Sequence, residues 1–430
     1  MSTDATPRTE AAGAPEGTPR PEATDVAPGM SAAALAATPA LREEVVLGPG
    51  LRSGGTVVHH VKDPATGWFY RVGPREHFIM ARFDGRHTLE EIAGEYLATF
   101  GRRLAQEHWN QIFTMLGTRQ LLAGAADPAA LSRLAEAHAE RSRADRSPMR
   151  QRRALFHPDA WCAAMARRLG WAYTAWFVVP ALLAVLALEI FVATHLTGLA
   201  DDAHAGAGLW LSIPAGLVGL WLITVLHEAA HGVTCKHFGG AVPEIGIMWR
   251  FPMFAPYCKT DDVVLFQRRH ARVLTAFAGV FVSLLALLPV LAWWALSAGH
   301  PVSRGLAAGL LMFGSVTAWL NLVPLFQLDG YHMLAHALRA AELRTETVRY
   351  AALVLRRDPR RLAYGRGDRW IYTVYGSVSA VVVGGGYLAL CVVWFSTLNR
   401  WTGTAVAAAV PVCVTLLILG FLAYARRRMR

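Results

Sequence analysis

Six long apolar runs dominate residues 171–424 of this 430-residue chain. They cover roughly residues 171–194, 209–235, 272–297, 305–326, 370–396 and 404–424. Each run is long enough to cross about 30 Å of hydrocarbon as a helix, the form that satisfies every backbone polar group in lipid. Because 54% of the residues are hydrophobic and only 17% are charged, the composition excludes an ordinary soluble protein. We therefore expect a mainly α-helical, multi-pass membrane protein with about six transmembrane helices.

Basic residues are distributed unevenly between these runs. They gather before the first run, after the second and fourth runs and in the C-terminal tail, whereas the alternate loops hold only Arg304 and Arg400. Cytoplasmic loops carry the excess of Arg and Lys, so both termini are expected on the cytoplasmic side of the cell membrane. Membrane anchoring also accounts for the net charge of +11, and we expect no nucleic-acid partner. The preference for arginine and alanine is typical of a GC-rich bacterial genome.

The polar N-terminal part divides by composition. Residues 1–42 are rich in Ala, Pro, Thr, Gly and Glu and predict a disordered tail. Residues 43–124 predict a small α+β, winged-helix-like cytoplasmic domain. In it, β-type stretches at 56–61 and 68–72 flank a turn, and a capping box at 88–91 opens a helix. Residues 125–157 predict a basic helical connector, which is either a solvated face or a contact with anionic lipid headgroups.

The second apolar run ends with His227, Glu228 and His231. A spacing of four places both imidazoles on one face of a helix, where they can bind one zinc ion, and Glu228 lies beside them as a base for a water molecule. Ionisable groups in an apolar helix are costly and mark functional sites. The alternative interpretation is a capped and internally paired helix end.

The fourth apolar run ends in a segment that contains Asn321, Pro324, Asp329 and Gly330. Counting 1.5 Å per residue along both runs places Asp329 at a depth similar to that of His231. Two histidines and one carboxylate make a three-ligand site with an open position, the arrangement of catalytic rather than structural zinc. Pro324 is expected to break the helix and Gly330 to permit an unusual turn, although an ordinary helix stop would also fit.

Both motifs resemble those of the site-2 protease family of intramembrane zinc metalloproteases. The matching residues are His227-Glu228-x-x-His231-Gly232 and Asn321-x-x-Pro324-x-x-x-Leu328-Asp329-Gly330. The resemblance covers about residues 155–345 and implies His227, His231 and Asp329 as Zn²⁺ ligands. It also implies Glu228 as the catalytic base and Asn321 as a residue that positions the substrate. Leu322 replaces a proline of many bacterial members, and no segment is long enough for their inserted PDZ domain.

Residues 68–73 and 83–92 resemble the PqqD-like domain, which binds leader peptides of ribosomally made, modified peptides. A generic winged-helix domain with a structural role is the alternative. The expected organisation is then a PqqD-like domain at 43–124 and a metalloprotease core at 158–345. A cytoplasmic loop at 346–369 and two further transmembrane helices with a basic tail at 370–430 complete it.

These features predict a zinc endopeptidase that acts near the cytoplasmic leaflet on a precursor peptide recruited by the N-terminal domain. Its partners would be a peptide or membrane-protein substrate, the lipid bilayer, and modification or export enzymes of the same peptide pathway. One alternative is a regulated intramembrane protease that acts on membrane-anchored regulators. The other is a non-proteolytic membrane protein for peptide export or immunity.

Several features stay open at this level. Residues 239–251 predict short strands, one edge of which would receive an extended substrate by strand addition, or a loop packed only for stability. Cys235 and His237 are weak candidates for further ligands. His332 and His336 are expected to line a pocket or the interface, and Glu189 to be protonated or paired.

Overall fold

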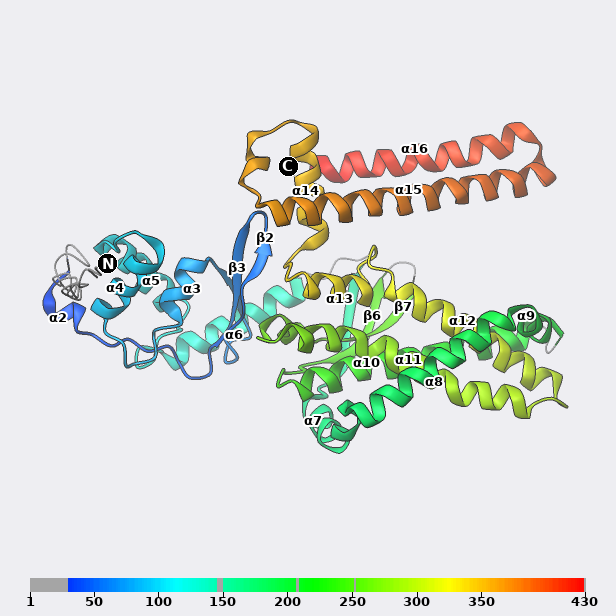
Figure 1. The fold of residues 1–430 in the computed structure, drawn as a ribbon, viewed down its shortest axis with the longest axis horizontal. Coiled ribbons are helices and arrows are strands. Elements are labelled where there is room, and N and C mark those ends of the chain that lie inside the picture. Colours follow the sequence, from blue (N-terminus) through cyan, green and yellow to red (C-terminus); the bar gives the residue numbers. More distant parts are fainter. Residues whose placement is uncertain (1–29, 145–149, 206–208, 251–252, 429–430) are drawn as a thin grey trace, which may run out of the picture. The chain divides into compact units, whose positions relative to one another are not determined.

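The computed structural model describes residues 30–144, 150–205, 209–250 and 253–428 (Figure 1). Within them the chain forms two compact units. The first unit comprises residues 30–47 and 61–144, and the second comprises residues 48–60 and the described residues from 150 onward. A short stretch of the N-terminal region therefore belongs to the unit that carries the apolar helices.

The first unit is a small α+β domain. Its elements are α2 (Ala32–Leu35), β1 (Val46–Leu47), the end of β3 (Thr56–Lys62), β4 (Phe69–Val72), α3 (Pro74–Met80), α4 (Leu89–Phe100), α5 (Gln106–Thr118) and α6 (Pro128–Ala144). The predicted capping box is present, since Thr88 and Glu91 exchange side-chain and backbone hydrogen bonds at the start of α4. The core gathers around Trp109, which is 1% exposed. The expected small domain of strands and helices is confirmed.

The N-terminal boundary of this domain differs from the expectation. Of the predicted disordered tail at 1–42, residues 1–29 lie outside the described part of the chain. Residues 30–42, however, are ordered against the domain: Leu35 is buried in the core, and Leu41 forms a β-bridge with Leu122. Composition alone missed these two leucines, whose burial stabilises the segment.

The second unit contains the apolar helices. Its helical elements are α7 (Asp159–Arg168), η1 (Gly170–Tyr173), α8 (Ala175–Thr194), α9 (Leu196–Ala205), α10 (Leu209–His237), η2 (Asp261–Leu265), α11 (Arg269–Leu296), α12 (Pro301–Leu322), α13 (Asp329–Ala337), α14 (Leu343–Leu355), η3 (Pro359–Ala363), α15 (Arg366–Thr402) and α16 (Thr404–Arg428). Its strands are β2 (Leu51–Ser53), most of β3, β5 (Arg150–Phe156), β6 (Ile245–Arg250) and β7 (Met253–Cys258).

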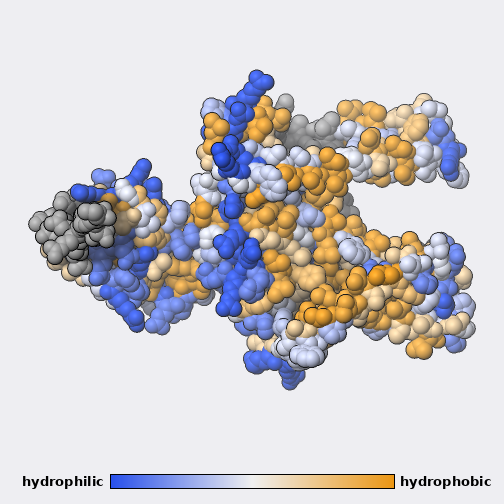
Figure 2. All heavy atoms as spheres, in the orientation of Figure 1, coloured by the Kyte–Doolittle hydropathy of each residue, from blue (hydrophilic) through white to orange (hydrophobic). Residues whose placement is uncertain are grey.

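Five helices in the described residues are long and apolar enough to span a membrane: α8, α10, α11, α12 and α15. The sixth expected span corresponds to α16, whose apolar described part, Thr404–Leu417, is shorter. The chain is thus a mainly helical, multi-pass membrane protein. Figure 2 shows hydrophobic residues over α8 to α12 and polar residues over much of the N-terminal unit.

Helix α11 lies at the centre of the bundle and packs against α10, α12 and α13. Its buried face is made largely of small residues, among them Thr275, Ala276, Gly279 and Ser283. Small side chains let neighbouring helices approach closely in lipid, where dispersion contacts rather than water exclusion hold helices together. This close packing brings α10 and α13, the two elements that carry the motif residues, to the same face of α11.

A three-stranded antiparallel sheet accompanies the bundle, in the order β5-β6-β7. The strands expected at 239–251 are present as β6, and β7 completes a hairpin. Residues 150–156, expected within a helical connector, form strand β5 instead and pair with β6. Of the described residues of that connector, those of α6 are helical. The helical prediction failed because residues 152–156 are all exposed and show no strand-like alternation, and because the strand gains its hydrogen bonds from β6, a partner about a hundred residues away.

The segment expected as a cytoplasmic loop at 346–369 is largely α14 and η3. It contacts the turn of the β2–β3 hairpin within the second unit. The tip glycines Gly54 and Gly55 adopt left-handed backbone conformations, with φ of 58° and 82°. A Cβ at Gly54 would lie 2.8 Å from Glu346 Oε2, and one at Gly55 would lie 3.1 Å from the Ala363 carbonyl oxygen. Only glycine allows both the turn and this close approach.

Candidate metal centre

Three side chains from two distant segments meet inside the helix bundle. His227 and His231 extend from α10, and Asp329 begins α13. His227 Nε2 lies 2.9 Å from Asp329 Oδ2, His231 Nε2 lies 3.4 Å from Asp329 Oδ1, and the two Nε2 atoms are 3.2 Å apart. All three side chains are at most 16% exposed. The structure therefore brings together the three residues that the sequence assigned as ligands, and they could hold a metal ion.

Each imidazole is oriented through its other ring nitrogen by α11. His231 Nδ1 lies 2.7 Å from the Thr275 carbonyl oxygen. A carbonyl only accepts, so His231 Nδ1 carries the proton and Nε2 presents a lone pair. His227 Nδ1 lies 3.0 Å from Ser283 Oγ, which can accept in the same way. Partners of this kind fix the tautomer and ring orientation of histidine ligands in metal sites.

The arrangement fits a cation. Two Nε2 atoms and two carboxylate oxygens converge, with one Nε2 atom within 3.4 Å of each oxygen of Asp329. Burial would raise the pKa of Asp329, but the adjacent His227 and His231 side chains hold the pKa below its usual range. The carboxylate is thus ionised at neutral pH, as a metal ligand must be.

Glu228 lies beside the ligands but is held separately. Its Oε2 accepts a hydrogen bond from the backbone N–H of Cys258 at 2.8 Å, at the end of β7. Burial, followed by the charge of Glu228, raises the pKa of the Cys258 thiol, so this thiol stays protonated and inert. The sheet thus positions Glu228, a contact that could not be predicted from the sequence.

Gly279 of α11 faces both imidazoles. A Cβ there would lie 2.6 Å from His227 Nε2 and still closer to His231 Nε2. No carbon atom can occupy that position without displacing the rings or filling the space of a metal ion. Glycine is therefore required at this position for the site to form.

Gly279→Ala is expected to lower metal affinity by about tenfold to a hundredfold, the range seen when the surroundings of a ligand are disturbed. Titration of metal-free protein against a competing chelator would measure the change. Gly309→Ala is the matched control, because a Cβ at Gly309 meets nothing within 4 Å. Equal affinities of the two variants would show that Gly279 does not border the metal.

Ser283→Ala is expected to weaken metal binding by about tenfold, because His227 loses the partner that fixes its tautomer. Ser303→Ala removes a hydroxyl that bonds Trp293 and Ser297 instead, and should leave affinity within about twofold of wild type. The same chelator competition reads out both variants. If Ser283→Ala binds metal as tightly as Ser303→Ala, the orienting role assigned to Ser283 is wrong.

The loop before Asp329 ends helix α12 next to Pro324 as expected, but the unusual backbone turn expected at Gly330 is absent. Helix α12 ends at Leu322, and Pro324 follows it. Gly330 has an ordinary φ, and its role is close approach: a Cβ there would overlap the carbonyl group of Leu322. This contact lets α13 start directly beside the end of α12, so that Asp329 reaches the histidines. Tyr375 of α15 donates to the Pro324 carbonyl oxygen at 3.1 Å and supports the turn.

The remaining candidates lie outside the three-ligand group. Cys235 is fully buried among apolar residues, and His237 stacks on Tyr173 at a centroid separation of 3.8 Å. His332 and His336 lie along α13 with rings 6.4 Å apart. Burial and then the charge of His332 lower the pKa of His336 to about 3, so this histidine stays neutral in the folded protein. None of the four belongs to the ligand cluster found among the described residues.

Asn321 lies half-buried at the end of α12, where the motif places it, and its side chain makes no hydrogen bond within the described residues. Glu189 of α8 is paired: its carboxylate accepts from Ser315 Oγ at 2.9 Å and Trp319 Nε1 at 2.8 Å. Both partners are on α12, so Glu189 joins α8 to the helix that leads to Asp329. Of the two states expected for Glu189, the structure therefore shows the paired one, between α8 and α12.

Three residues of α11 that border the site were not predicted, although their spacing in the sequence is regular. Thr275, Gly279 and Ser283 are spaced by four within an otherwise apolar run. That spacing places them on one helical face, and polar or absent side chains at such positions are unusual in lipid. The repeat would have identified α11 as the helix against which the histidines pack.

Comparisons of the chain with protein-family models, with curated proteins and with solved structures find no match in any of the three. The function is therefore inferred from the residues and geometry of the chain itself.

Proposed function

We propose that this protein is a membrane-embedded zinc metalloendopeptidase whose centre is formed by His227, His231 and Asp329. One observation carries the proposal. The three ligand groups have atoms within 4.8 Å of one another inside an apolar helix bundle, with Glu228 beside them but anchored elsewhere. A purely structural zinc site would use four protein ligands and would need no adjacent acid. The motifs that resemble the site-2 protease family support the same interpretation.

The ligand set favours zinc, because imidazole and carboxylate ligands on helices suit this ion. When bound, zinc would act as a Lewis acid that polarises a carbonyl group and lowers the pKa of a water molecule. Glu228 would accept the proton of that water through its oxygen that does not bond Cys258, and would then deliver the proton to the leaving amine. The surrounding apolar helices exclude bulk water from the reacting groups.

A peptide must be extended for its carbonyl group to reach the centre, since helical carbonyls are already hydrogen-bonded. Strand β5 occupies one edge of β6, so the hairpin can add a substrate strand only along β7. That edge faces the centre, because Cys258 N–H bonds Glu228 there, and it carries Pro256, which has no N–H to donate. A substrate strand on β7 would therefore be held mainly by carbonyl groups of the protein.

The N-terminal domain is proposed to recruit the substrate. Its resemblance to PqqD-like domains and its size favour a ribosomally made precursor peptide as the substrate class. The arginine distribution favours the cytoplasmic leaflet as the place of cleavage. Together these features favour peptide maturation over the clipping of membrane-anchored regulators.

The proposal is tested by co-expressing the full chain with short peptides encoded next to its gene and measuring their masses. We expect two fragments per precursor in the presence of wild type, and none with Glu228→Gln or after zinc chelation. Uncleaved precursor with the metal-loaded wild type, together with cleavage of an adjacent anti-sigma factor, would overturn the maturation role and favour regulated proteolysis. Cleavage of neither would favour a non-proteolytic export or immunity protein.

A further inference from the structure

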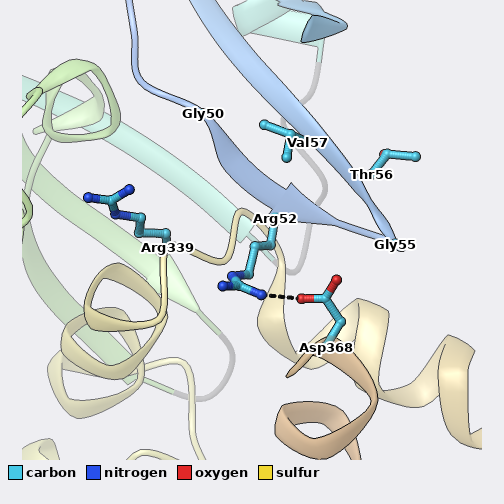
Figure 3. A pocket seen from close by; sticks show the side chains of 7 residues that line it. All are labelled: Gly50, Arg52, Gly55, Thr56, Val57, Arg339 and Asp368. Carbon is cyan, nitrogen blue, oxygen red and sulfur yellow. Dashed lines mark hydrogen bonds and ion pairs between the residues drawn. The ribbon is translucent and has the colours of Figure 1, made fainter. Parts of the chain in front are cut away.

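A cavity of about 330 Å³ lies along the β2–β3 hairpin up to its turn, and none of the residues of the candidate metal centre lines it (Figure 3). Three segments of the second unit line it: the hairpin, the turn after α13, and the first turn of α15. The lining residues are Gly50, Arg52, Gly55, Thr56, Val57, Arg339 and Asp368. Its polar groups are dominated by two guanidinium groups, which makes it unlike the apolar surface of the spans.

The walls of the cavity are fixed by backbone hydrogen bonds. Arg52 N–H donates to the Arg339 carbonyl oxygen at 2.6 Å, and Ala341 N–H donates to the Arg52 carbonyl oxygen at 2.9 Å. Arg339 adopts a left-handed conformation with φ of 54°, which is unfavourable for a residue with a side chain. The fold therefore holds Arg339 in a strained geometry beside Arg52, at a fixed point of the cavity wall.

The cavity carries more positive than negative charge. Arg52 Nη1 lies 2.6 Å from Asp368 Oδ1, and the two side chains point toward one another while Arg339 lies on the other side of Arg52 (Figure 3). Asp368 thus contacts one nitrogen of a group that has five N–H donors. Within the described residues no carboxylate pairs with Arg339. With two guanidinium groups and one carboxylate, the cavity has a net charge of +1 and can accept one further negative charge.

The position of the cavity indicates the source of that charge. Asp368 is in the first turn of α15, a candidate membrane span that begins at Arg366. Trp370, two residues after Asp368, is 67% exposed, and tryptophan is enriched at the headgroup level of membranes. The surrounding basic residues are Arg356, Arg357, Arg360, Arg361, Arg366 and Arg369. A guanidinium cavity at this level is suited to a lipid phosphate.

We propose that Arg52 and Arg339 bind the phosphate of an anionic phospholipid headgroup in this cavity. Thr56 and the backbone of Gly50 and Gly55 form the remaining wall around the headgroup. The acyl chains would lie along the exposed apolar start of α15. Bound lipid would join the hairpin to the segment that follows α13, the helix that carries Asp329.

Lipid titration of the full chain in nanodiscs, read out by native mass spectrometry, tests the proposal. Wild type should retain phosphatidylglycerol in preference to phosphatidylcholine. Arg339→Gln should weaken phosphatidylglycerol binding by about tenfold, the effect of one lost charge-assisted contact. The matched control Arg356→Gln removes an exposed arginine outside the cavity and should change binding by less than about twofold.

A second variant distinguishes loss of the binding site from misfolding of the protein. Asp368→Asn removes the competing carboxylate and should tighten phosphatidylglycerol binding by about twofold or more, which damage to the fold cannot do. Equal loss in Arg339→Gln and Arg356→Gln would overturn the proposal. Displacement of the lipid by soluble glycerol 3-phosphate at similar concentrations would identify a free-phosphate site instead. Arg339-dependent binding of an acidic peptide without lipid would identify a peptide site.

Discussion

Replacing Glu228 with glutamine is expected to slow peptide cleavage by about a hundredfold to ten-thousandfold, the usual contribution of a general acid–base residue. Glutamine has the size of glutamate and can still accept the Cys258 N–H through its carbonyl oxygen, so the local fold should persist. It cannot take up a proton at neutral pH. Bound zinc should stay at the wild-type level, because Glu228 is not part of the three-ligand group.

The matched control for this variant is Glu244→Gln, the same substitution 16 residues further along the chain and outside the ligand group. Its cleavage rate should stay within about twofold of wild type. Rates would be measured by mass spectrometry of the fragments, and zinc by elemental analysis of the purified protein. A Glu228→Gln variant that cleaves as fast as Glu244→Gln would remove Glu228 from the mechanism. One that has lost its zinc would show instead that Glu228 is a ligand.

Replacing Asp329 with asparagine is expected to lower zinc affinity by at least about a hundredfold, since even the loss of a residue that only orients a ligand reaches that size. The amide is neutral, so a zinc ion bound to the two Nε2 atoms would have no anionic protein ligand to neutralise part of its charge. Peptide cleavage should fall together with zinc content. Both quantities would be followed while zinc is added back, because excess metal should restore part of the rate.

Asp358→Asn provides the control, since Asp358 lies outside the ligand group and its partner is Arg360. It should bind one zinc ion as wild type does. Retention of stoichiometric zinc by Asp329→Asn after dialysis against a chelator would contradict the ligand assignment. Partial rescue by added zinc distinguishes a weakened site from an unfolded protein.

The candidate metal centre could be predicted from the sequence because the spacing of residues along single helices is enough to identify its ligands. The spacing of His227 and His231 fixes a common helix face, and counting residues along two spans sets the depth of Asp329. Both inferences need only helix geometry. The structure places these three residues together as expected, and it confirms a mainly helical membrane protein with a small α+β region.

What the sequence did not reveal depends on contacts between distant segments. Strand β5 looked like part of a basic helix because its partner β6 lies about a hundred residues away. The hairpin around Arg52 looked like part of the N-terminal domain, yet it bonds to Arg339 and Ala341. Likewise, the bond from Cys258 to Glu228 joins a sheet to a helix. Hydrophobic periodicity carries no information about such partners.

Cleavage in ¹⁸O-labelled water directly tests whether the protein hydrolyses peptide bonds with a bound metal ion and Glu228. The purified, zinc-loaded full chain would be reconstituted in nanodiscs with a mixture of soluble and membrane-spanning peptides, and the products would be analysed by mass spectrometry. We expect paired fragments in which one ¹⁸O atom enters each new carboxyl group, and we expect chelation or Glu228→Gln to abolish them. Labelled fragments that form equally well without metal, or with the Glu228→Gln variant, would contradict the proposed mechanism.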